Sequence, residues 1–386
     1  MPRHPDISPV IAAMPRGVFS SVAHRIAGLR GEVYPLHIGD TWLEPPEGCR
    51  LEDLRTEQHP GIHRYGRPRG RPELIAAIAA RHGVSEDRVL VSTGATGALG
   101  AALGALLDPG DEVLVLAPFW PLIRGIVTSQ RGVPVEVPYY VDPPGHRGTP
   151  LGERSVEERL APWLTTRTVA IYLNSPNNPS GVVLPAAELA ELAAFARRHG
   201  LWLLSDEVYE QLSWTGPPRS IREFAPERTF SACSFSKAWA MAGNRVGYLL
   251  GPEVPEIVEE VRKVAMHGWY AAPNGPQVAA VRVLSGDCDG WLQAARAHYR
   301  EAALRAAELL GMPAPDGGTF LLVDVSHRID ERGMQGFLED CIDRRLLVAP
   351  GASCGQAYAD TVRVCFTSAP LSVVEEGLGV LAELLR

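Results

Sequence analysis

The sequence is short of cysteine and has no long uninterrupted apolar run. Its six cysteines are scattered over 386 residues without a C-x-x-C pair, so neither a zinc site nor a disulfide framework is indicated. A reducing cytoplasm is therefore the expected location. Charged residues and prolines interrupt every apolar stretch, which argues against a membrane span. No long apolar segment follows the first residues, as it would in a secretory signal.

Positive charge is also scarce for a protein that would bind polyanions. The 37 Lys and Arg residues against 45 Asp and Glu leave a net charge of −8, which argues against a nucleic-acid or anionic-membrane partner. Hydrophobic residues make up 46% and charged residues 21% of the chain, a composition typical of a soluble globular protein. The length allows one large or two to three ordinary domains.

One lysine stands in a stretch whose residues could support a reaction. Lys237 follows a strand-like run at 229–234, with Ser234 and Ser236 before it and Arg245 eight residues on. A lysine can form a Schiff base with an aldehyde cofactor if its site lowers its pKa, and hydroxyls beside a cation suit a phosphate group. Taken alone, the motif favours a simpler alternative, an exposed lysine in a serine-rich turn, because short motifs match by chance.

Strand-like runs alternate with helical patterns along much of the chain. The expected strands before Lys237 cover residues 88–92, 112–117, 133–138, 168–173, 201–205 and 229–234. This alternation predicts a mostly parallel sheet. Such sheets bind ligands at the carboxyl ends of their strands, and a polar or glycine-rich segment follows nearly every one of these runs.

The turn after residues 88–92 reads Thr-Gly-Ala-Thr-Gly and opens a helix of small residues. A strand, a glycine turn and a helix together form an anion-binding arrangement, because backbone N–H groups and the helix dipole point at a phosphate. A Rossmann nucleotide site uses the same device. The glycines at 94, 97 and 100 lack the G-x-G-x-x-G spacing of that site.

Taken together, these segments resemble the class I/II aminotransferases of pyridoxal-phosphate fold type I. The family motifs Ser-x-[Ser/Ala]-Lys and Gly-x-Arg-x-Gly-Tyr correspond to residues 234–237 and 243–248. The Asn-x-Pro-x-Asn-Pro-[Thr/Ser]-Gly motif corresponds to 174–181, and Asp-Glu-Val-Tyr at 206–209 follows a strand-like run. The resemblance extends from Gly39 to Arg363, nearly the whole chain.

The resemblance implies that pyridoxal 5'-phosphate is bound as a Schiff base to Lys237, the general base and acid. Asp206 would pair with the protonated pyridine nitrogen and so make the ring an electron sink. Asn178 and Tyr209 would hydrogen-bond the ring oxygen. Without the family, a strand-terminal aspartate is more often a helix cap, but the order of these four residues matches the family.

The resemblance also implies which residues contact the phosphate and the faces of the ring. The implied phosphate contacts are Ala95, Thr96, Ser234 and Arg245. Trp120 would stack on the pyridine ring, although a core aromatic at a strand end is the alternative. Tyr65 would reach the phosphate of the neighbouring subunit, which implies a homodimer with shared sites; otherwise it is an aromatic residue in a loop rich in Gly and Pro.

On the substrate side, the resemblance implies that Arg363 clamps the α-carboxylate with its fork of donors. Gly39 would let that carboxylate approach the backbone, with Asn178 beside it. An edge-strand arginine and an ordinary turn glycine are the alternatives. In one branch of the family a second arginine binds a side-chain carboxylate, but His267 stands there in this chain, near Trp269 and Tyr270. A dicarboxylate is therefore not expected as the strongly preferred donor.

The fold implied is α/β: a large domain with a mostly parallel seven-stranded sheet flanked by helices, and a smaller α+β domain. Residues 1–45 would form an N-terminal arm and part of the small domain, 46–289 the large cofactor-binding domain, and 290–386 the small C-terminal domain. The run 245–251 would be an antiparallel strand. The residues themselves predict a short strand into a tight turn at 36–40 and a helical pattern at 18–29.

The expected activity is the transfer of an amino group between an L-amino acid and a 2-oxo acid, with no metal. A pyridoxal-phosphate-dependent lyase, synthase or oxidase shares the same motifs, so these alternatives stay open. A non-catalytic sensor that binds the cofactor is a further alternative. The presence of Lys237 argues against it, and no DNA-binding segment precedes Gly39.

Overall fold

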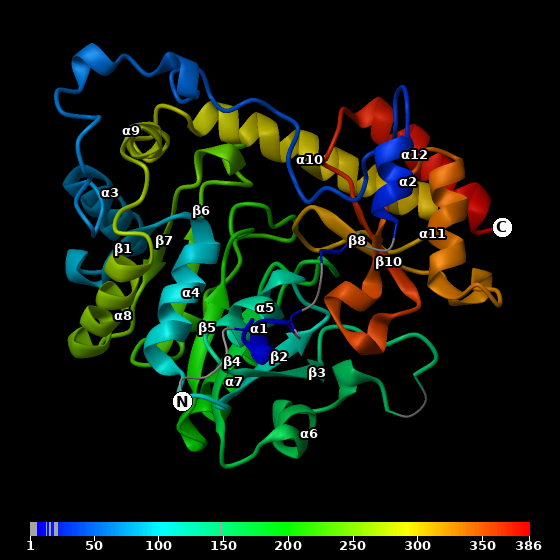
Figure 1. Cartoon of the computed structure of the whole chain (residues 1–386), viewed down its shortest axis with the longest axis horizontal. Helices are drawn as coiled ribbons and strands as arrows, with labels where there is room; N and C mark the ends of the chain where they lie inside the picture. The colour runs from blue at the N-terminus through cyan, green and yellow to red at the C-terminus, as the bar shows by residue number, and fades with distance from the viewer. Residues whose placement is uncertain (1–5, 13, 15–16, 19–21, 147–148) are drawn as a thin grey trace.

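A seven-stranded sheet forms the centre of the computed structural model, which describes all residues except 1–5, 13, 15–16, 19–21 and 147–148 (Figure 1). The strands lie in the order β1-β7-β6-β5-β4-β2-β3. In chain order they are β1 (Val89–Ser92), β2 (Glu112–Ala117), β3 (Val133–Pro138), β4 (Thr168–Asn174), β5 (Trp202–Asp206), β6 (Thr229–Ser234) and β7 (Gly247–Leu250).

The sheet is mostly parallel, as predicted. Strands β2 to β6 pair in parallel, whereas β7 is antiparallel to both β6 and β1. The middle of β4 is buried and reads Ala-Ile-Tyr-Leu, the continuous apolar pattern of a parallel strand covered on both faces. All strands but β7 therefore run in one direction, and their carboxyl ends meet at one edge.

Helices cover both faces of this sheet. Helices α4, α5 and α8 pack on one face and α6 and α7 on the other. Buried alanines of α4 let it lie close to the strands. The helices are α1 (Pro9–Ala12), α2 (Ala23–Gly28), α3 (Pro72–His82), α4 (Gly94–Leu106), α5 (Leu122–Ser129), α6 (Val156–Leu160), α7 (Ala186–Arg198), α8 (Pro255–Gly268), α9 (Asn274–Val283), α10 (Asp289–Leu310), α11 (Gly333–Asp343) and α12 (Leu371–Leu384).

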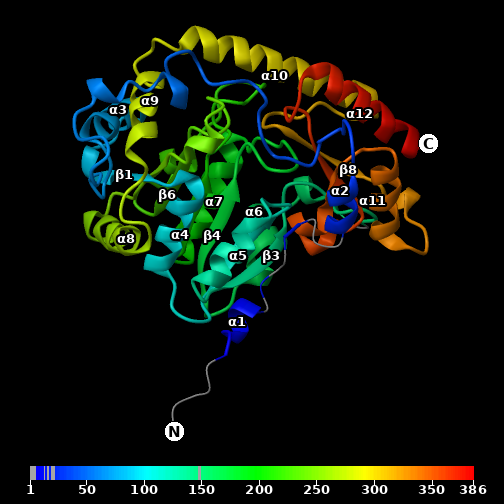
Figure 2. The same ribbon diagram turned by 45° about the horizontal axis from the view of Figure 1, so that its top comes forward.

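A second, antiparallel sheet lies near the C-terminal end, in the order β8-β10-β9. Its strands are β8 (Phe320–Asp324), β9 (Ala349–Pro350) and β10 (Thr361–Cys365). Helices α2, α11 and α12 lie around it, and the 22-residue α10 runs from the large sheet towards it (Figures 1 and 2). Among the described helices, none is long and apolar enough to cross a membrane.

Two local predictions need correction. Of the strand and tight turn predicted at 36–40, the structure has the turn, where the Leu36 carbonyl accepts a hydrogen bond from the Cys365 amide at 2.7 Å. Just before it, Tyr34 forms an isolated bridge with Leu346. The helical pattern predicted at 18–29 gives the shorter α2, and residues 19–21 lie outside the described residues. The domain boundaries after residues 45 and 289 stay a prediction.

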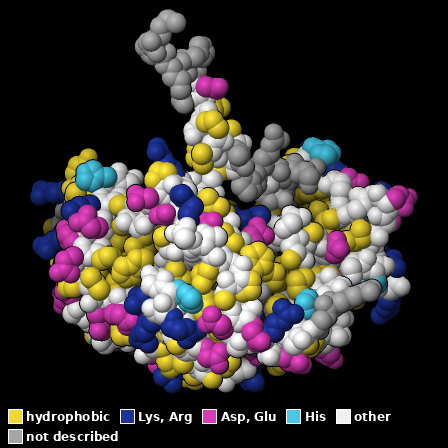
Figure 3. All heavy atoms as spheres, turned by 90° about the horizontal axis from the view of Figure 1, so that it is seen from below, with side chains coloured by type: hydrophobic (Ala, Val, Ile, Leu, Met, Phe, Trp, Pro, Cys, Tyr) yellow, Lys and Arg dark blue, Asp and Glu magenta, His cyan; other side chains and the backbone are white. Residues whose placement is uncertain are grey.

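Helix α1 contacts α5 and stands out from the body of the molecule, away from the sheets (Figures 2 and 3). No residue of α1 is buried. Ile7, Val10 and Ile11 are exposed there, which is uncommon for a cluster of large apolar side chains on a single chain.

Candidate active site

A cavity of about 260 Å³ lies at the carboxyl ends of the central strands. It is lined by polar segments after β5 and β6, by the start of α4 and by Arg363 of β10. Every residue predicted for the cofactor or the substrate lines this cavity except Tyr65: Gly39, Ala95, Thr96, Trp120, Asn178, Asp206, Tyr209, Ser234, Lys237, Arg245 and Arg363. The structure thus brings together residues that are up to 324 positions apart in the chain.

Lys237 follows β6, and its side chain is only 15% exposed. Its Nζ donates to the Gly39 carbonyl at 2.6 Å and lies 3.7 Å from Asp40 Oδ1. Burial lowers the pKa of the amine and the positive charge of Arg363 adds to this, while Asp40 opposes it. A buried lysine with a lowered pKa is suited to act as a nucleophile and as a base.

Asp206 ends β5 and is buried at the wall of the cavity. Its Oδ2 accepts from the Tyr172 hydroxyl at 2.7 Å, and its Oδ1 accepts from the Val208 amide at 3.3 Å. Burial raises the pKa of the carboxyl to about 6, and both hydrogen bonds oppose the rise. A buried acid of this kind is stabilised by a cationic group in the cavity.

Arg363 on β10 is buried without a carboxylate partner among the described residues. Its Nη1 donates to Asn178 Oδ1 at 3.1 Å and its Nη2 to the His37 carbonyl at 3.2 Å, while Nε has no hydrogen-bond partner. The guanidinium lies over the Phe320 ring, 4.4 Å from its centroid. A buried cation that lacks a counter-ion favours an anionic ligand.

Asn178 and Tyr209 lie together beside this guanidinium and line the cavity. Asn178 Nδ2 is 3.5 Å from the Tyr209 hydroxyl, and the Asn178 amide donates to Asn174 Oδ1 at 2.7 Å. Burial raises the pKa of Tyr209, so its hydroxyl stays protonated and can donate a hydrogen bond.

The start of α4 also lines the cavity, through Ala95 and Thr96. Gly94 has a φ of 76°, and a β-carbon there would lie 2.6 Å from Arg245 Nη2. Arg245 Nη2 donates to the Thr93 carbonyl at 3.3 Å, and the Ser234 hydroxyl donates to Ser236 Oγ at 2.7 Å. A helix N-terminus, a guanidinium and hydroxyls in one place form an anion site.

Trp120 and Gly39 complete the walls. Trp120 follows β2 and is half-buried, with its side chain on the cavity. A β-carbon at Gly39 would lie 2.8 Å from the Phe320 ring and 3.9 Å from Arg363 Nη2. Only glycine therefore leaves room for a ligand to approach the backbone beside that arginine.

Tyr65 lies outside the cavity in this single chain. It is 91% exposed, and its ring packs edge-on against Tyr270 with 5.2 Å between the centroids. Trp269 and Tyr270 line the same surface hollow as Tyr65. His267 is exposed at the end of α8, where its Nδ1 lies 2.8 Å from the Lys263 carbonyl, and it does not line the cavity either.

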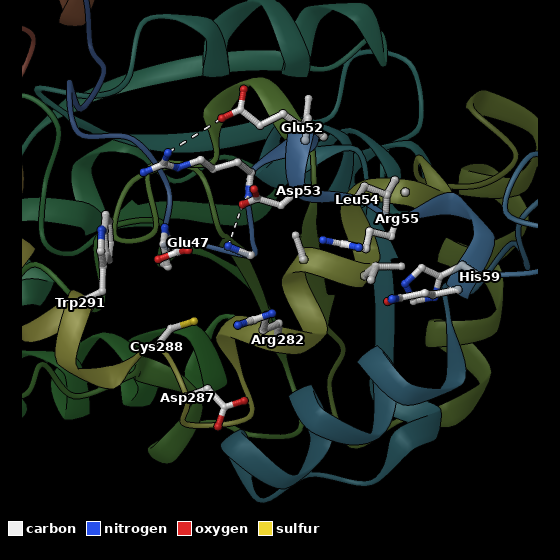
Figure 4. Close-up of a pocket in the computed structure, with 18 residues that line it drawn as sticks. Glu47, Glu52, Asp53, Leu54, Arg55, His59, Arg282, Asp287, Cys288 and Trp291 are labelled. Carbon is white, nitrogen blue, oxygen red and sulfur yellow. Dashed lines mark hydrogen bonds and ion pairs between the residues drawn. The ribbon is translucent and has the colours of Figure 1, made fainter.

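A second, larger cavity of about 780 Å³ lies between residues 46–59 and the α9–α10 region (Figure 4). Acidic and basic side chains alternate around it, among them Glu47, Asp53, Arg55 and Arg282. No residue predicted for the cofactor or the substrate lines it. Buried ionisable groups meet in the smaller cavity, which makes it the candidate active site.

Several residues of the smaller cavity were not predicted. Asn174, Val208, Ser236 and Ala242 also line it, and Tyr172 contacts Asp206 from outside. The contact of Tyr172 could have been anticipated in part, because a tyrosine inside an apolar strand needs a partner for its hydroxyl.

Comparison with known proteins agrees with this geometry. The family model "Aminotransferase class I and II" matches residues 32–381. A probable aspartate/prephenate aminotransferase of Thermus aquaticus is 33% identical over 76% of this chain and 78% of its own. An arginine–pyruvate transaminase of Pseudomonas aeruginosa is 34% identical over 86% of this chain and 85% of its own. A mutant Thermus thermophilus aspartate aminotransferase has a TM-score of 0.87, with 29% identity over 99% of this chain and 100% of that one.

The fold and the site thus define a pyridoxal-phosphate-type α/β enzyme. The chain belongs to the class I and II aminotransferase family, and it is an aminotransferase. The predictions of fold class, family and enzyme class are confirmed, and the lyase, synthase, oxidase and sensor alternatives are not favoured. The family uses pyridoxal phosphate, and amino acids and 2-oxo acids are the class of substrate.

Proposed function

We propose that this aminotransferase binds pyridoxal 5'-phosphate in the 260 Å³ cavity and transfers an amino group from an L-amino acid to a 2-oxo acid there. One observation carries the proposal: a largely buried lysine, a buried aspartate and a buried arginine without a counter-ion line the same cavity. Each of these groups is costly on its own. Together they suit a ligand with a carbonyl carbon, a cationic ring nitrogen and a carboxylate.

The residues present fit the cofactor. The start of α4 with Ala95 and Thr96, together with Ser234 and Arg245, would hold the phosphate, and Trp120 would cover the ring. Bound pyridoxal phosphate supplies an electron-poor ring that accepts the electrons released when the substrate Cα–H bond breaks. Asp206 would maintain the positive charge of the ring nitrogen, and Asn178 and Tyr209 would donate to the ring oxygen.

The protein side chains then bind the substrate and move one proton. Arg363 would bind the α-carboxylate with Gly39 and Asn178 beside it. The Lys237 amine would take the proton from the substrate Cα, because its lowered pKa leaves a larger neutral fraction. The resulting ammonium would be stabilised by the Gly39 carbonyl, 2.6 Å from Nζ, and by Asp40.

Borohydride labelling tests this proposal. Lys237 and Lys263 are the only lysines in the chain, and Lys263 is an exposed residue paired with Glu260. We expect the protein with pyridoxal phosphate to absorb visible light, and borohydride to bleach it and fix the cofactor on the Lys237 peptide alone. A colourless protein, or a label only on the Lys263 peptide, would refute the proposal.

We also propose a homodimer with shared sites, supported by the exposed apolar arm and by Tyr65, which is 91% exposed and outside the cavity. Mixing inactive Lys237→Ala chains with inactive Tyr65→Ala chains should restore about a quarter of the wild-type activity, because half of the dimers are mixed and each has one intact site. Mass measurement should show two chains. A fully active monomer at high dilution would contradict this.

We propose that the enzyme does not strongly prefer a dicarboxylate as its amino donor. The relatives named above differ in their stated substrates, and among the described residues that line the cavity the cations are Lys237, Arg245 and Arg363. The measurement is kcat/KM for a panel of donors with one acceptor. An advantage of aspartate or glutamate of about a hundredfold over every neutral donor, roughly 2.7 kcal/mol, would show this prediction to be wrong.

The cytoplasmic location expected from the cysteine pattern stays a prediction. All six cysteines are free and buried.

A further inference from the structure

Tyr172 occupies an unusual position for a tyrosine. It lies in β4 at the centre of the large sheet and is completely buried. Its hydroxyl donates to Asp206 Oδ2 at 2.7 Å. A buried phenol needs a hydrogen-bond partner, and here the partner is the aspartate at the wall of the cofactor cavity.

The register of the sheet explains why the two side chains meet. Strands β4 and β5 pair in parallel, with Tyr172 opposite Leu204 and Asn174 opposite Asp206. Residues two apart share a face of a sheet, so Tyr172 and Asp206 project from the same face, two positions apart along the strands. The length of the phenol spans this offset. Asn174 Nδ2 donates to the Asp206 carbonyl at 2.8 Å and fixes the strand ends relative to each other.

Among the charged and titratable groups around Asp206, Tyr172 is the main side chain that stabilises the ionised carboxylate. Tyr172 from β4, Tyr140 from the segment after β3, and Glu207 and Tyr209 from the segment after β5 surround it. Burial raises its pKa to about 6, and Glu207 adds to the rise. The Tyr172 hydrogen bond is the largest opposing effect, followed by the Val208 amide.

We infer that Tyr172 is a positioning residue of the cofactor site: its hydroxyl keeps the Asp206 carboxylate ionised and oriented toward the cavity at neutral pH, an inference that rests on the function proposed above. Without this hydroxyl, the carboxyl would hold its proton into the working pH range and could not pair with a cationic ring nitrogen. The competing explanation is that the phenol only fills the core.

The variant Tyr172→Phe removes the hydroxyl and keeps the ring. Tyr140→Phe is the matched control, because the Tyr140 hydroxyl also lies near Asp206 but accepts from the Asn174 amide at 2.8 Å, whereas the hydrogen bonds to the carboxylate come from Tyr172 and Val208. The measurements are kcat and the visible absorbance of the loaded protein against pH, and the Kd of pyridoxal phosphate by dialysis. For Tyr172→Phe we expect the acidic limb of both profiles to move up by about one pH unit and the Kd to rise about tenfold. Activity should recover at higher pH, and Tyr140→Phe should keep the wild-type profile.

The outcomes separate this inference from the proposed function. A wild-type protein that binds no pyridoxal phosphate would overturn both. If the wild type binds it and Tyr172→Phe has an unshifted profile, or loses activity equally at every pH, the hydroxyl is only structural and the inference is wrong. If Tyr172→Phe does not fold, the double variant Tyr172→Phe/Asp206→Asn should fold, because no buried carboxylate is then left without its donor. A double variant that also fails to fold would overturn the inference.

Discussion

Replacing Lys237 with alanine should lower the rate of transamination by about 10⁴-fold, the upper range for the loss of a positioned general base. The buried amine is the only lysine nitrogen that faces the cavity among the described residues, so no neighbouring lysine can replace it. Pyridoxal phosphate should still bind, because the expected phosphate contacts at the start of α4, Ser234 and Arg245 do not depend on the lysine. Steady-state rates and equilibrium dialysis measure the two effects separately.

The matched control is Lys263→Ala, which removes the other lysine of the chain. Lys263 is exposed on α8 and paired with Glu260 at 2.7 Å, and exposed ion pairs of this kind contribute little. This variant should keep wild-type activity. A Lys237→Ala protein that retains more than about a hundredth of the wild-type rate would show that another group moves the proton.

The strands and the polar segments that follow them could be predicted from the sequence because both depend on local pattern. The apolar runs of β1 to β6 predicted a parallel sheet, and in such a sheet the strand ends converge whatever the details of packing. Asp206 and Lys237 could therefore be placed near each other from their positions after β5 and β6. The family resemblance added Arg363 and Gly39, which local pattern alone could not connect to the site.

Contacts that depend on register or on a second chain could not be predicted in this way. The hydrogen bond from Tyr172 to Asp206 requires the alignment of β4 with β5, since a slip of one residue would turn the tyrosine to the opposite face. The turn at 36–40 looked like a strand because Leu36 and Ile38 are apolar. Its Ile38 and Asp40 amides bond locally, to the carbonyls of Pro35 and Ile38, and the Leu36 carbonyl accepts from the Cys365 amide at the end of β10. For Tyr65, the predicted contact with a second chain comes from the family resemblance and stays a prediction.

Replacing Asp206 with asparagine should have two opposite effects, and the first is on catalysis. Asparagine keeps the shape and can accept from Tyr172, but it lacks the charge that, in the proposed site, would hold a proton on the cofactor ring nitrogen. We expect kcat to fall by about 10²–10³-fold, the range for removal of one preorganised electrostatic contact. Steady-state kinetics at pH 8 give this value, and Asp324→Asn, an exposed aspartate at the end of β8, is the control that should leave it unchanged.

The second effect is on the stability of the protein without cofactor, and it follows from the sign of the pKa shift. The pKa of Asp206 rises from 3.8 to about 6 on folding, so between these values the folded protein binds more protons than the unfolded chain. The free energy of unfolding therefore falls as the pH rises through this window, by about 3 kcal/mol in total. Asp206→Asn avoids this loss. It should be more stable than the wild type above pH 6, and the difference should vanish as the pH falls toward 4.

Urea unfolding of the two proteins without cofactor, at pH 4 and pH 8, measures this difference. An Asp206→Asn variant that is less stable at pH 8, or whose advantage does not change with pH, would contradict the burial of an ionised carboxylate. The expected result links the two effects: a buried charge that destabilises the empty protein is kept where the proposed cofactor would pair with it. A loss of stability when Asp206 ionises would therefore distinguish it from an aspartate that only supports the fold. An aspartate of that second kind would stabilise the folded state when ionised.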